Sequence, residues 1–528
     1  MTPFQVFRRW FGRAPSYQKV ASVTAAAMTI AALTWAVVPA GSQSAATYGL
    51  GSTGGSGGST RGGTTPGATA GTGGAPGAAG VGGVGGTSGA GGSAGGSAGG
   101  SAGGATGASG GGSGTGSSSG HCVSPSGNVP GVTATQINIA IIIVDIAGPA
   151  ADSTFGIASP ANQQAAFQAV INNINAGGGL DCRKLVAQFY NGNPVDQGGL
   201  QQLCLTISQA NVFAVADPGA YANYAPGLDC YAQNHIPYFE GYQLDAGQVR
   251  KDYPYLFSLG TLDNSYKDSV FGLKQLGFFD PANGFKKLGV IYRNCYPDIV
   301  NEEFSWLAQA GVGASEISSY DMGCPQVFAS PSDEENAIVQ FRNAGVTNMT
   351  EVFELGDMAS FTNTAQSQGF HPKWGLADDA LFEINNGTES PNPQNLDGAM
   401  GITASRNGEN NVPSLASNPT AGTQKCNAIM QSVGLSPVDK EAAAIGNACD
   451  QLWMLQAAVD DAPVFSQAAL GAGLQRAGSI DFSYPQGPNN FTAPGTTTGG
   501  QFWRQDTYTT AGGCNCWEVV NPNFFPSF

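Results

Sequence analysis

Charged residues are scarce in this chain of 528 residues, and its first quarter holds almost none of them. The whole sequence has 21 Lys and Arg and 37 Asp and Glu, which is 11% charged residues, against a usual share of about 25%. No Asp or Glu precedes Asp145, and only five basic residues precede His121. The remaining 16 basic and 37 acidic residues give the region 121–528 a net charge of −21. A region this acidic repels nucleic acid and anionic lipid, so we expect neither as a partner.

Histidine and catalytic signatures are also scarce. The chain has three His, at positions 121, 235 and 371, and its Cys show no C-x-x-C spacing, so we expect no metal site. The region 121–528 contains no G-x-S-x-G elbow, no G-x-x-x-x-G-K phosphate loop and no H-E-x-x-H motif. We therefore expect no enzyme activity and no cofactor.

The first 40 residues are typical of a membrane-directed segment. Four basic residues between positions 8 and 19 precede the uncharged run 20–40, VASVTAAAMTIAALTWAVVPA. A basic flank, an apolar run and small residues at its end indicate an export signal that is cleaved near Ala40. The run is also long enough to span a bilayer as an uncleaved anchor. Both interpretations place the rest of the chain outside the cytoplasmic membrane.

Residues 41–130 have the composition of a linker. Between positions 41 and 120, 35 of 80 residues are Gly, and Arg61 is the one charged residue. Such a sequence has few apolar side chains to offset the backbone entropy lost on folding, so we expect it to be disordered. Behind a retained anchor this linker would be a tether.

All ten Cys lie after the linker, and in an exported chain this favours disulfides. We expect pairs that are close in sequence, each stabilising the fold by roughly 3 kcal/mol: Cys182–Cys204, Cys295–Cys324 and Cys426–Cys449. Cys514 and Cys516 are too close to favour each other, and Cys122 and Cys230 remain as candidate partners.

Strand and helix patterns alternate after the linker. Apolar, β-branched runs such as QINIAIIIV at Gln136–Val144 predict buried parallel strands, and amphipathic stretches between them predict helices. The first part predicts strands at 136–144, 185–190, 212–216 and 236–239, with helices at 161–176, 199–210 and 224–234. The second part predicts strands at 287–292, 314–320, 351–354, 373–377 and 399–405, with helices at 268–277, 299–311, 333–345, 358–369 and 441–459. Two such series predict an α/β fold of two doubly wound lobes with a cleft between them.

One junction and several ordered stretches resemble a known family. Residues 174–180, INAGGGL, followed by Lys184 and Leu185, resemble the "INAxGGI…KL" junction of leucine/isoleucine/valine-binding proteins. Gly148-Pro149 after the first strand, LGTLD at 259–263 and GVIY at 289–292 agree in order and spacing. From about residue 131 to 520 the chain thus resembles the type I periplasmic-binding-fold solute receptors of ABC transporters.

The resemblance implies two hinged lobes that close over a small solute. Lobe 1 would comprise 131–260 and about 406–480, and lobe 2 would comprise 261–405 and about 481–528. The ligand-binding residues implied at the strand ends are Tyr221, Asn223, Tyr224, Glu240, Tyr242, Tyr296, Asp357 and Asp378. Tyr296 corresponds to an aromatic residue of the family, and Asp378 to the acid that holds a ligand ammonium. The loop 217–224 lacks the Ser/Thr run that holds an amino-acid carboxylate, so an amide, amine, polyol or aromatic ligand fits at least as well.

Several of these residues also have a structural interpretation. Tyr221 and Tyr224 could pack a loop onto a helix, and Tyr296 could cover the neighbouring disulfide. Glu240 and Asp357 could cap a loop or a helix, because an acid near a helix start is favourable.

Together these features predict an extracytoplasmic solute-binding protein that acts as a monomer. It would capture a small polar solute, such as an amino acid or an amide, and deliver it to an ABC-type permease. The alternative is a ligand-sensing accessory module tethered at the cell surface. An enzyme on the same fold ranks last.

Overall fold

The computed structural model shows the acidic region as two sheets with their helices. It describes residues 127–146, 148, 152, 157–221, 224–294, 297–323, 330–352, 355–377, 391–436, 442–483, 487–493, 495–500 and 502–528, and of residues 242, 355–357, 407 and 442–444 the backbone alone. The membrane-directed segment, the linker up to residue 126 and the candidates Asn223, Tyr296 and Asp378 lie outside these ranges. Within them, no helix combines the length and the apolar character needed to cross a bilayer.

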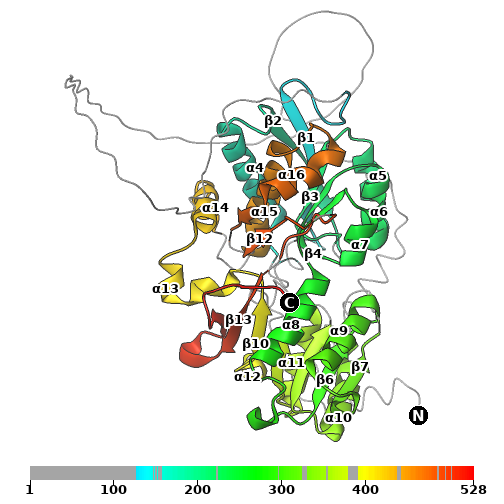
Figure 1. Ribbon diagram of the computed structural model, residues 1–528, viewed down its shortest axis with the longest axis vertical. Helices are drawn as coiled ribbons and strands as arrows, with labels where there is room; N and C mark the ends of the chain where they lie inside the picture. Colours follow the sequence, from blue (N-terminus) through cyan, green and yellow to red (C-terminus); the bar gives the residue numbers. More distant parts are fainter. Residues whose placement is uncertain are drawn as a thin grey trace, which may run out of the picture. The chain divides into compact units, whose positions relative to one another are not determined.

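The first sheet has five parallel strands in the order β2-β1-β3-β4-β5 (Figure 1). Its elements are β1 (Gln136–Val144), α4 (Pro160–Ala176), β2 (Lys184–Gly192), α5 (Gln197–Ser208), β3 (Ala214–Asp217), α6 (Ala225–Gln233), β4 (Tyr238–Leu244), α7 (Ala246–Lys251) and β5 (Leu256–Thr261). The strands and helices predicted here are confirmed, with shifted ends, while β5 and α7 have no counterpart in the prediction. Residues 139–142 of β1 are completely buried, because neighbouring strands flank it on both edges and helices cover its faces.

The junction between α4 and β2 explains the Gly run that follows the helix. The Asn175 side chain donates a hydrogen bond to the Leu185 carbonyl (2.9 Å) and accepts one from the Leu185 N–H (2.8 Å). Gly179 has a φ of 83°, and a Cβ there would lie 2.0 Å from the Arg183 carbonyl oxygen. Both the left-handed backbone and the close approach require glycine at this position.

The second sheet is mixed, in the order β14-β13-β10-β9-β8-β6-β7, with β15 paired to β13. Strands β6 to β10 run parallel to one another, whereas β13 is antiparallel to β10, β14 and β15. Its elements are α8 (Leu262–Gln275), η1 (Pro281–Asn283), β6 (Leu288–Tyr292), α9 (Pro297–Ala310), η2 (Ala314–Glu316), β7 (Ile317–Asp321), α10 (Pro331–Ala344), β8 (Asn348–Val352), α11 (Leu355–Ser367), β9 (Lys373–Leu376), α12 (Pro393–Leu396), β10 (Met400–Thr403), β13 (Phe502–Thr509), η5 (Ala511–Gly513), β14 (Cys516–Val519) and β15 (Phe525–Pro526). The predicted alternation is confirmed. The strand expected at 314–320 begins instead as the 3-10 turn η2, and the one expected at 351–354 lies at 348–352.

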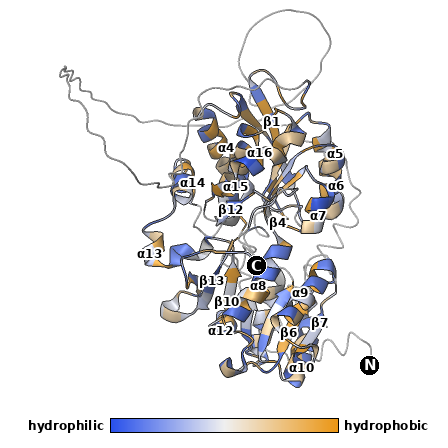
Figure 2. Ribbon diagram, in the orientation of Figure 1, coloured by the Kyte–Doolittle hydropathy of each residue, from blue (hydrophilic) through white to orange (hydrophobic). Residues whose placement is uncertain are grey.

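After β10 the chain returns to the first sheet. This part contains η3 (Asn407–Asn411), α13 (Pro413–Ala416), α14 (Ala421–Gln431), α15 (Ala442–Asp460), η4 (Gln467–Ala469), α16 (Leu470–Ala477) and the antiparallel pair β11 (Ser479–Asp481) and β12 (Pro488–Asn490). Helix α15, predicted at 441–459, packs on α4 and β4 (Figure 1). Its Leu452 and Leu455 share one hydrophobic core with Ile139 and Phe167. Figure 2 shows hydrophobic and hydrophilic residues together on α4 and α16, as expected of helices with one face on a core.

Three chain segments connect the two sheets, and we call them the crossover region. The first runs from β5 into α8, the second from β10 into η3, and the third from residue 497 into β13. The third lies against the first, because the Ser258 N–H donates to the Thr497 carbonyl (3.2 Å) and the Gly499 N–H donates to the Ser258 carbonyl (3.0 Å).

The disulfides correct two expectations drawn from sequence distance. Cys204 of α5 is bonded to Cys230 of α6 and not to Cys182, which also excludes the pairing of Cys230 with Cys122. The two helices pack side by side, and the Cα atoms of Cys204 and Cys230 lie 6.4 Å apart, within the usual range for a disulfide. Packing of the helices therefore decides the pairing.

The other disulfides give one confirmation and one correction. Cys426 of α14 is bonded to Cys449 of α15, as predicted. Cys514 is bonded to Cys516, although their closeness in sequence argued against it. The pair predicted between residues 295 and 324 lies outside the described residues.

Candidate ligand-binding site

The loop that follows β3 is wrapped around the carboxylate of Asp217. This side chain is completely buried. It accepts hydrogen bonds from the backbone N–H groups of Gly219 (3.3 Å), Ala220 (2.9 Å) and Tyr221 (2.9 Å). The loop therefore uses three consecutive N–H groups on a carboxylate of its own chain.

Asp217, the last residue of β3, lies beside a second buried acid within the neighbouring strand β4. Asp217 and Glu240 are Cα partners in the pairing of β3 with β4, and both are completely buried. The Tyr238 hydroxyl is hydrogen-bonded to Asp217 and lies 3.1 Å from a Glu240 carboxylate oxygen. Burial raises the pKa of Asp217, although its hydrogen bonds with Tyr238 and the loop N–H groups oppose this. One hydroxyl has one proton, so Tyr238 donates to only one of the two carboxyl groups at a time.

Tyr221 takes part in a buried cluster of tyrosines. Its hydroxyl donates to the Leu200 carbonyl (2.5 Å) and accepts from Tyr231 (3.2 Å). Its ring meets the rings of Tyr231 and Tyr238 edge-on, with centroids 5.3 and 5.9 Å apart. Burial raises the pKa of Tyr221 above the usual range for tyrosine. In this conformation the side chain fills the space beneath α5 and α6, and contact with a solute would require the cluster to open.

Two further predicted tyrosines of the first sheet are Tyr224, which precedes α6, and Tyr242, which lies in β4. Tyr224 is half-buried at the start of α6, and its hydroxyl lies 3.4 Å from the Gln201 side-chain oxygen. Tyr242 lies at the irregularity in β4 where the register with β5 shifts between Glu240 and Gln243.

Helix α15 adds polar residues to this site that the sequence analysis did not single out. The Gln451 side-chain amide donates to the Asp217 carbonyl, and a Cβ on Gly241 would lie 2.2 Å from the same nitrogen. Asn447 is buried against Gly241 as well. The sequence does contain a signal for these residues. Asn447 lies three and four positions before Asp450 and Gln451, so the three form a polar stripe beside the apolar face of the helix.

Asp450 in this stripe is completely buried. It accepts a hydrogen bond from the Ser483 N–H (2.7 Å), which links α15 to the chain just after β11. Burial raises its pKa to about 8, which its hydrogen bonds with Ser483 and the charge of Arg406 only partly oppose. Asp450 is therefore largely protonated at neutral pH.

In the second sheet, a basic and two acidic side chains are buried near the strand ends. Arg293 directly follows β6, is 3% exposed, and donates its backbone N–H to the Val352 carbonyl at the end of β8 (3.1 Å). Glu351 on β8 accepts from the Ala377 N–H (3.4 Å), and Glu303 on α9 accepts from the Thr350 hydroxyl (3.3 Å). Burial, reinforced by the nearby Glu351, raises the pKa of Glu303 well above its usual value. Arg293 and the two Glu are further polar groups that the sequence analysis did not single out.

The predicted residues of this sheet fall largely outside the described ranges. Asp357 lies in the first turn of α11, where its backbone alone is described. Tyr296 and Asp378 are not among the described residues. Their ligand role stays a prediction.

A small cavity lies in the crossover region. It has room for little more than a water molecule and is lined by Gln243, Gly260, Thr261, Ser265, Asp268, Ile402, Thr403, Ala404, Gly500, Phe502 and Trp503. No predicted ligand residue is among them. Asp268 accepts from the Ser527 hydroxyl (2.7 Å) and the Phe528 N–H (2.9 Å), and burial raises its pKa to about 6. The cavity is thus part of the junction where the chain passes between the sheets.

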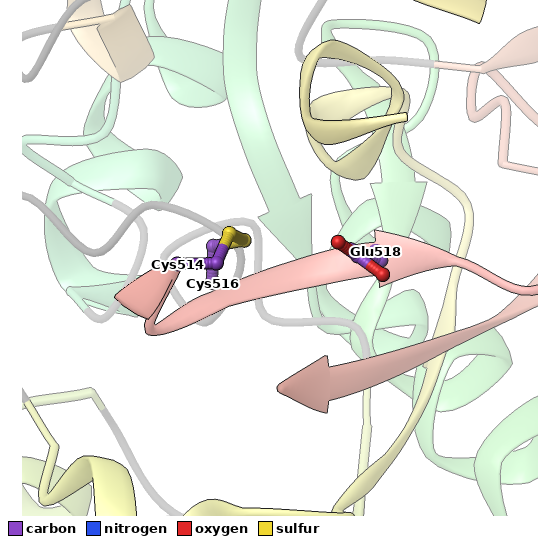
Figure 3. A group of neighbouring side chains, drawn as sticks. All are labelled: Cys514, Cys516 and Glu518. Carbon is purple, nitrogen blue, oxygen red and sulfur yellow. A yellow bond between two sulfur atoms is a disulfide. The ribbon is translucent and has the colours of Figure 1, made fainter. Parts of the chain in front are cut away.

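One group of side chains in the described ranges has the composition of a metal site. Cys514, Cys516 and Glu518 bring two sulfurs and a carboxylate oxygen within 4.8 Å of one another (Figure 3). The sulfurs are bonded to each other, so neither is a thiolate ligand in this structure.

The family follows from a match along most of the folded region. The family model described as "Periplasmic binding protein" matches residues 136–505. The chain belongs to the periplasmic binding protein family. Members of this extracytoplasmic family are not enzymes, in agreement with the expectation drawn from the missing catalytic motifs. None of the curated proteins matches the chain.

Solved structures of this fold are similar over about three quarters of the chain. A solute-binding protein of an ABC transporter from R. palustris, in complex with 4-hydroxybenzoate, is 12% identical, with 74% of this chain and 97% of that one covered and a TM-score of 0.55. A branched-chain amino acid transporter substrate-binding protein from Streptococcus pneumoniae, in complex with isoleucine, is 16% identical, with 74% and 100% covered and a TM-score of 0.52. A fatty acid ABC transporter substrate-binding protein from Thermomonospora curvata is 15% identical, with 77% and 95% covered and a TM-score of 0.52. At these identities the likeness establishes the fold.

Proposed function

We propose that this periplasmic binding protein captures a small polar solute between its lobes by hinge closure and delivers it to an ABC-type permease. The family match over residues 136–505 is the observation that carries the proposal. The similar structures named above are components of transporters, which supports delivery rather than sensing. The chain would act outside the cytoplasmic membrane, either anchored by residues 20–40 or released after cleavage near Ala40.

The loop after β3 supports a restriction on the solute. The N–H groups of Gly219, Ala220 and Tyr221 already donate to Asp217, so they are not available to a ligand carboxylate. The adjacent pair Asp217 and Glu240 adds negative charge beneath the same strand ends. We infer that this lobe holds a neutral or cationic group, such as an amide, an amine or a phenol.

The predicted ligand residues divide into two sets. Tyr221 and Glu240 belong to the buried layer beneath the strand ends. We propose direct contacts for the others: Asn223, Tyr224, Tyr242, Tyr296, Asp357 and Asp378. Tyrosine rings supply a flat apolar face with a polar tip, and acids opposite them hold a cation.

A thermal-shift screen of the purified full-length protein tests both the function and the ligand class. The panel would contain isoleucine, isoleucine amide, a polyamine, 4-hydroxybenzoate and a sugar. A solute at 100 times its Kd stabilises the folded state by about 2.7 kcal/mol, and we expect the amide or amine to raise the Tm more than isoleucine does. A larger shift with isoleucine would contradict the restriction, and no shift with any class of solute would contradict capture.

The variant Asp378→Ala tests the second lobe. We expect it to abolish the shift that the best solute produces while the Tm without solute stays unchanged. Glu335→Ala, which removes an exposed acid on α10, is the matched control and should bind as the unaltered chain does. Unchanged binding by Asp378→Ala would remove that residue from the site.

A further inference from the structure

The Cys514–Cys516 disulfide differs in what it connects from the two other disulfides that the structure describes in full. The bonds Cys204–Cys230 and Cys426–Cys449 join separate helices over 26 and 23 residues, and their four Cys are buried. The Cys514–Cys516 bond spans two residues. Because a disulfide stabilises mainly by restricting the unfolded chain, and does so more for longer loops, this one contributes least to stability. A role in stability alone therefore does not account for it.

The two sulfurs of this short bond have different surroundings. Cys514 lies in the turn between β13 and β14 and is exposed (Figure 3). Cys516 is 9% exposed and opens β14, where it pairs with Thr509. The next residue, Trp517, is buried edge-on against Tyr508, with ring centroids 5.4 Å apart. A reagent in solution therefore reaches Cys514 first, while the strand holds Cys516 in place.

We propose that Cys514–Cys516 is a site of thiol–disulfide exchange with thiols of low molecular weight. The incoming thiolate attacks Cys514 Sγ. A new S–S bond forms there, the bond to Cys516 breaks, and Cys516 leaves as a thiolate that takes up a proton from water. Cys516 can later attack Cys514 Sγ, expel the thiol and restore the original bond. Alternatively, a second thiol removes the first as its disulfide and leaves both Cys reduced.

Glu518 regulates the rate of this exchange. Its carboxylate oxygen and the two sulfurs lie within 4.8 Å of one another. A negative charge at this distance repels both the incoming thiolate and the Cys516 thiolate that leaves. The charge therefore slows opening and keeps the disulfide closed at low thiol concentrations.

The test exposes the native full-length protein to graded concentrations of reduced glutathione. After an acid quench and alkylation, peptide mass spectrometry gives the state of each Cys. We expect glutathione adducts or reduction at residues 514–516 while Cys204–Cys230 and Cys426–Cys449 remain intact. Opening of all three bonds together, or no reaction at residues 514–516, would overturn the proposal.

Three variants and one control variant separate an exchange site from a merely exposed bond. Glu518→Gln should accelerate the reaction by about threefold or more, whereas Glu335→Gln, on α10, should leave the rate unchanged. Cys516→Ser leaves Cys514 as a rapidly alkylated thiol, and Cys514→Ser leaves Cys516 as a slowly alkylated one. Equal alkylation of the two single variants, or an unchanged rate in Glu518→Gln, would overturn the assignment of roles.

Discussion

Asp217 at the end of β3 lies side by side with Glu240 of β4, and the Tyr238 hydroxyl contacts both carboxyl groups. Two buried carboxyl groups this close do not both ionise readily, because each charge disfavours the other and burial disfavours both. Burial accordingly raises the pKa of Asp217 above its usual value, although its hydrogen bonds oppose this. The loop N–H groups already donate to Asp217, and on this ground we propose that the lobe does not hold an amino-acid carboxylate.

Asp217→Ala should destabilise the protein by roughly 2 to 5 kcal/mol, because three buried N–H groups lose their acceptor. Asp217→Asn should cost less, since its amide oxygen still accepts from the loop and a neutral side chain suits the buried position. Urea unfolding followed by circular dichroism measures both changes. Equal losses for the two variants would mean that the loop does not depend on this acceptor.

Stability should fall as the pH rises from about 4 to 8. Burial raises the pKa of Asp268 to about 6 and that of Asp450 to about 8, so the folded state binds protons that the unfolded state has released. The two acids stabilise the fold fully at a pH below their pKa in the unfolded state. This contribution is lost as the pH rises through their pKa in the folded state.

Substitution of each acid separates the two contributions. Asp450→Asn should make the Tm decrease less steeply with pH up to about pH 8. Asp268→Asn should reduce the decrease in Tm only below about pH 6. Differential scanning fluorimetry at half-unit pH steps gives the two profiles. A slope that survives both substitutions would assign the pH dependence to other groups.

Gly179→Ala should destabilise the junction between α4 and β2 by at least about 3 kcal/mol, because strain at a positive φ adds to a backbone clash. The neighbouring Gly178→Ala is the matched control. Gly178 also has a positive φ, of 114°, but nothing lies within 4 Å of its Cβ position, so about 1 kcal/mol is expected. Chemical unfolding of the two variants compares them, and similar losses would show that the approach of Arg183 does not matter.

Removal of the Cys204–Cys230 disulfide by a double Ser substitution should cost roughly 3 to 4 kcal/mol in the chain-entropy model. The single variant Cys204→Ser should release one thiol, on Cys230, and leave Cys182 oxidised. Alkylation of the denatured protein followed by peptide mapping identifies the free thiol. Alkylation at Cys182 would instead show that Cys204 pairs with Cys182, as the sequence distance suggested.

The fold could be predicted where one physical signal dominates. The buried strands of the first sheet are continuous apolar runs, and β1 has no exposed residue after Gln136. The predicted start of the strand at 314–320 was wrong. Glu316 accepts a hydrogen bond from the Gly313 N–H (2.8 Å) and thereby favours a turn. Local propensity does not show this contact. The antiparallel β13 mixes polar and apolar residues without a continuous apolar run, and its pairing with β10 and β14 decides its formation.

The site was harder to predict than the fold, because its contacts join residues far apart in the sequence. Gln451 reaches Asp217 across 234 positions, and no local pattern encodes such a contact. Residue types at the strand ends identified Tyr221 and Glu240, but they could not show that Tyr221 is hydrogen-bonded to Leu200 inside the lobe. The absence of Ser and Thr from the loop predicts a different ligand, and this stays a prediction that the three N–H groups on Asp217 support.

The interleaved path of the chain has a consequence for its biogenesis. The core of the first sheet requires α15, and the second sheet requires β13 beside β10. Neither unit can complete its hydrophobic core while the last part of the chain is still being synthesised or translocated, and contacts between such distant residues form slowly. Incomplete chains would expose apolar strands to their surroundings, so we expect this protein to depend on factors that keep newly exported polypeptides apart until the C-terminal strands arrive.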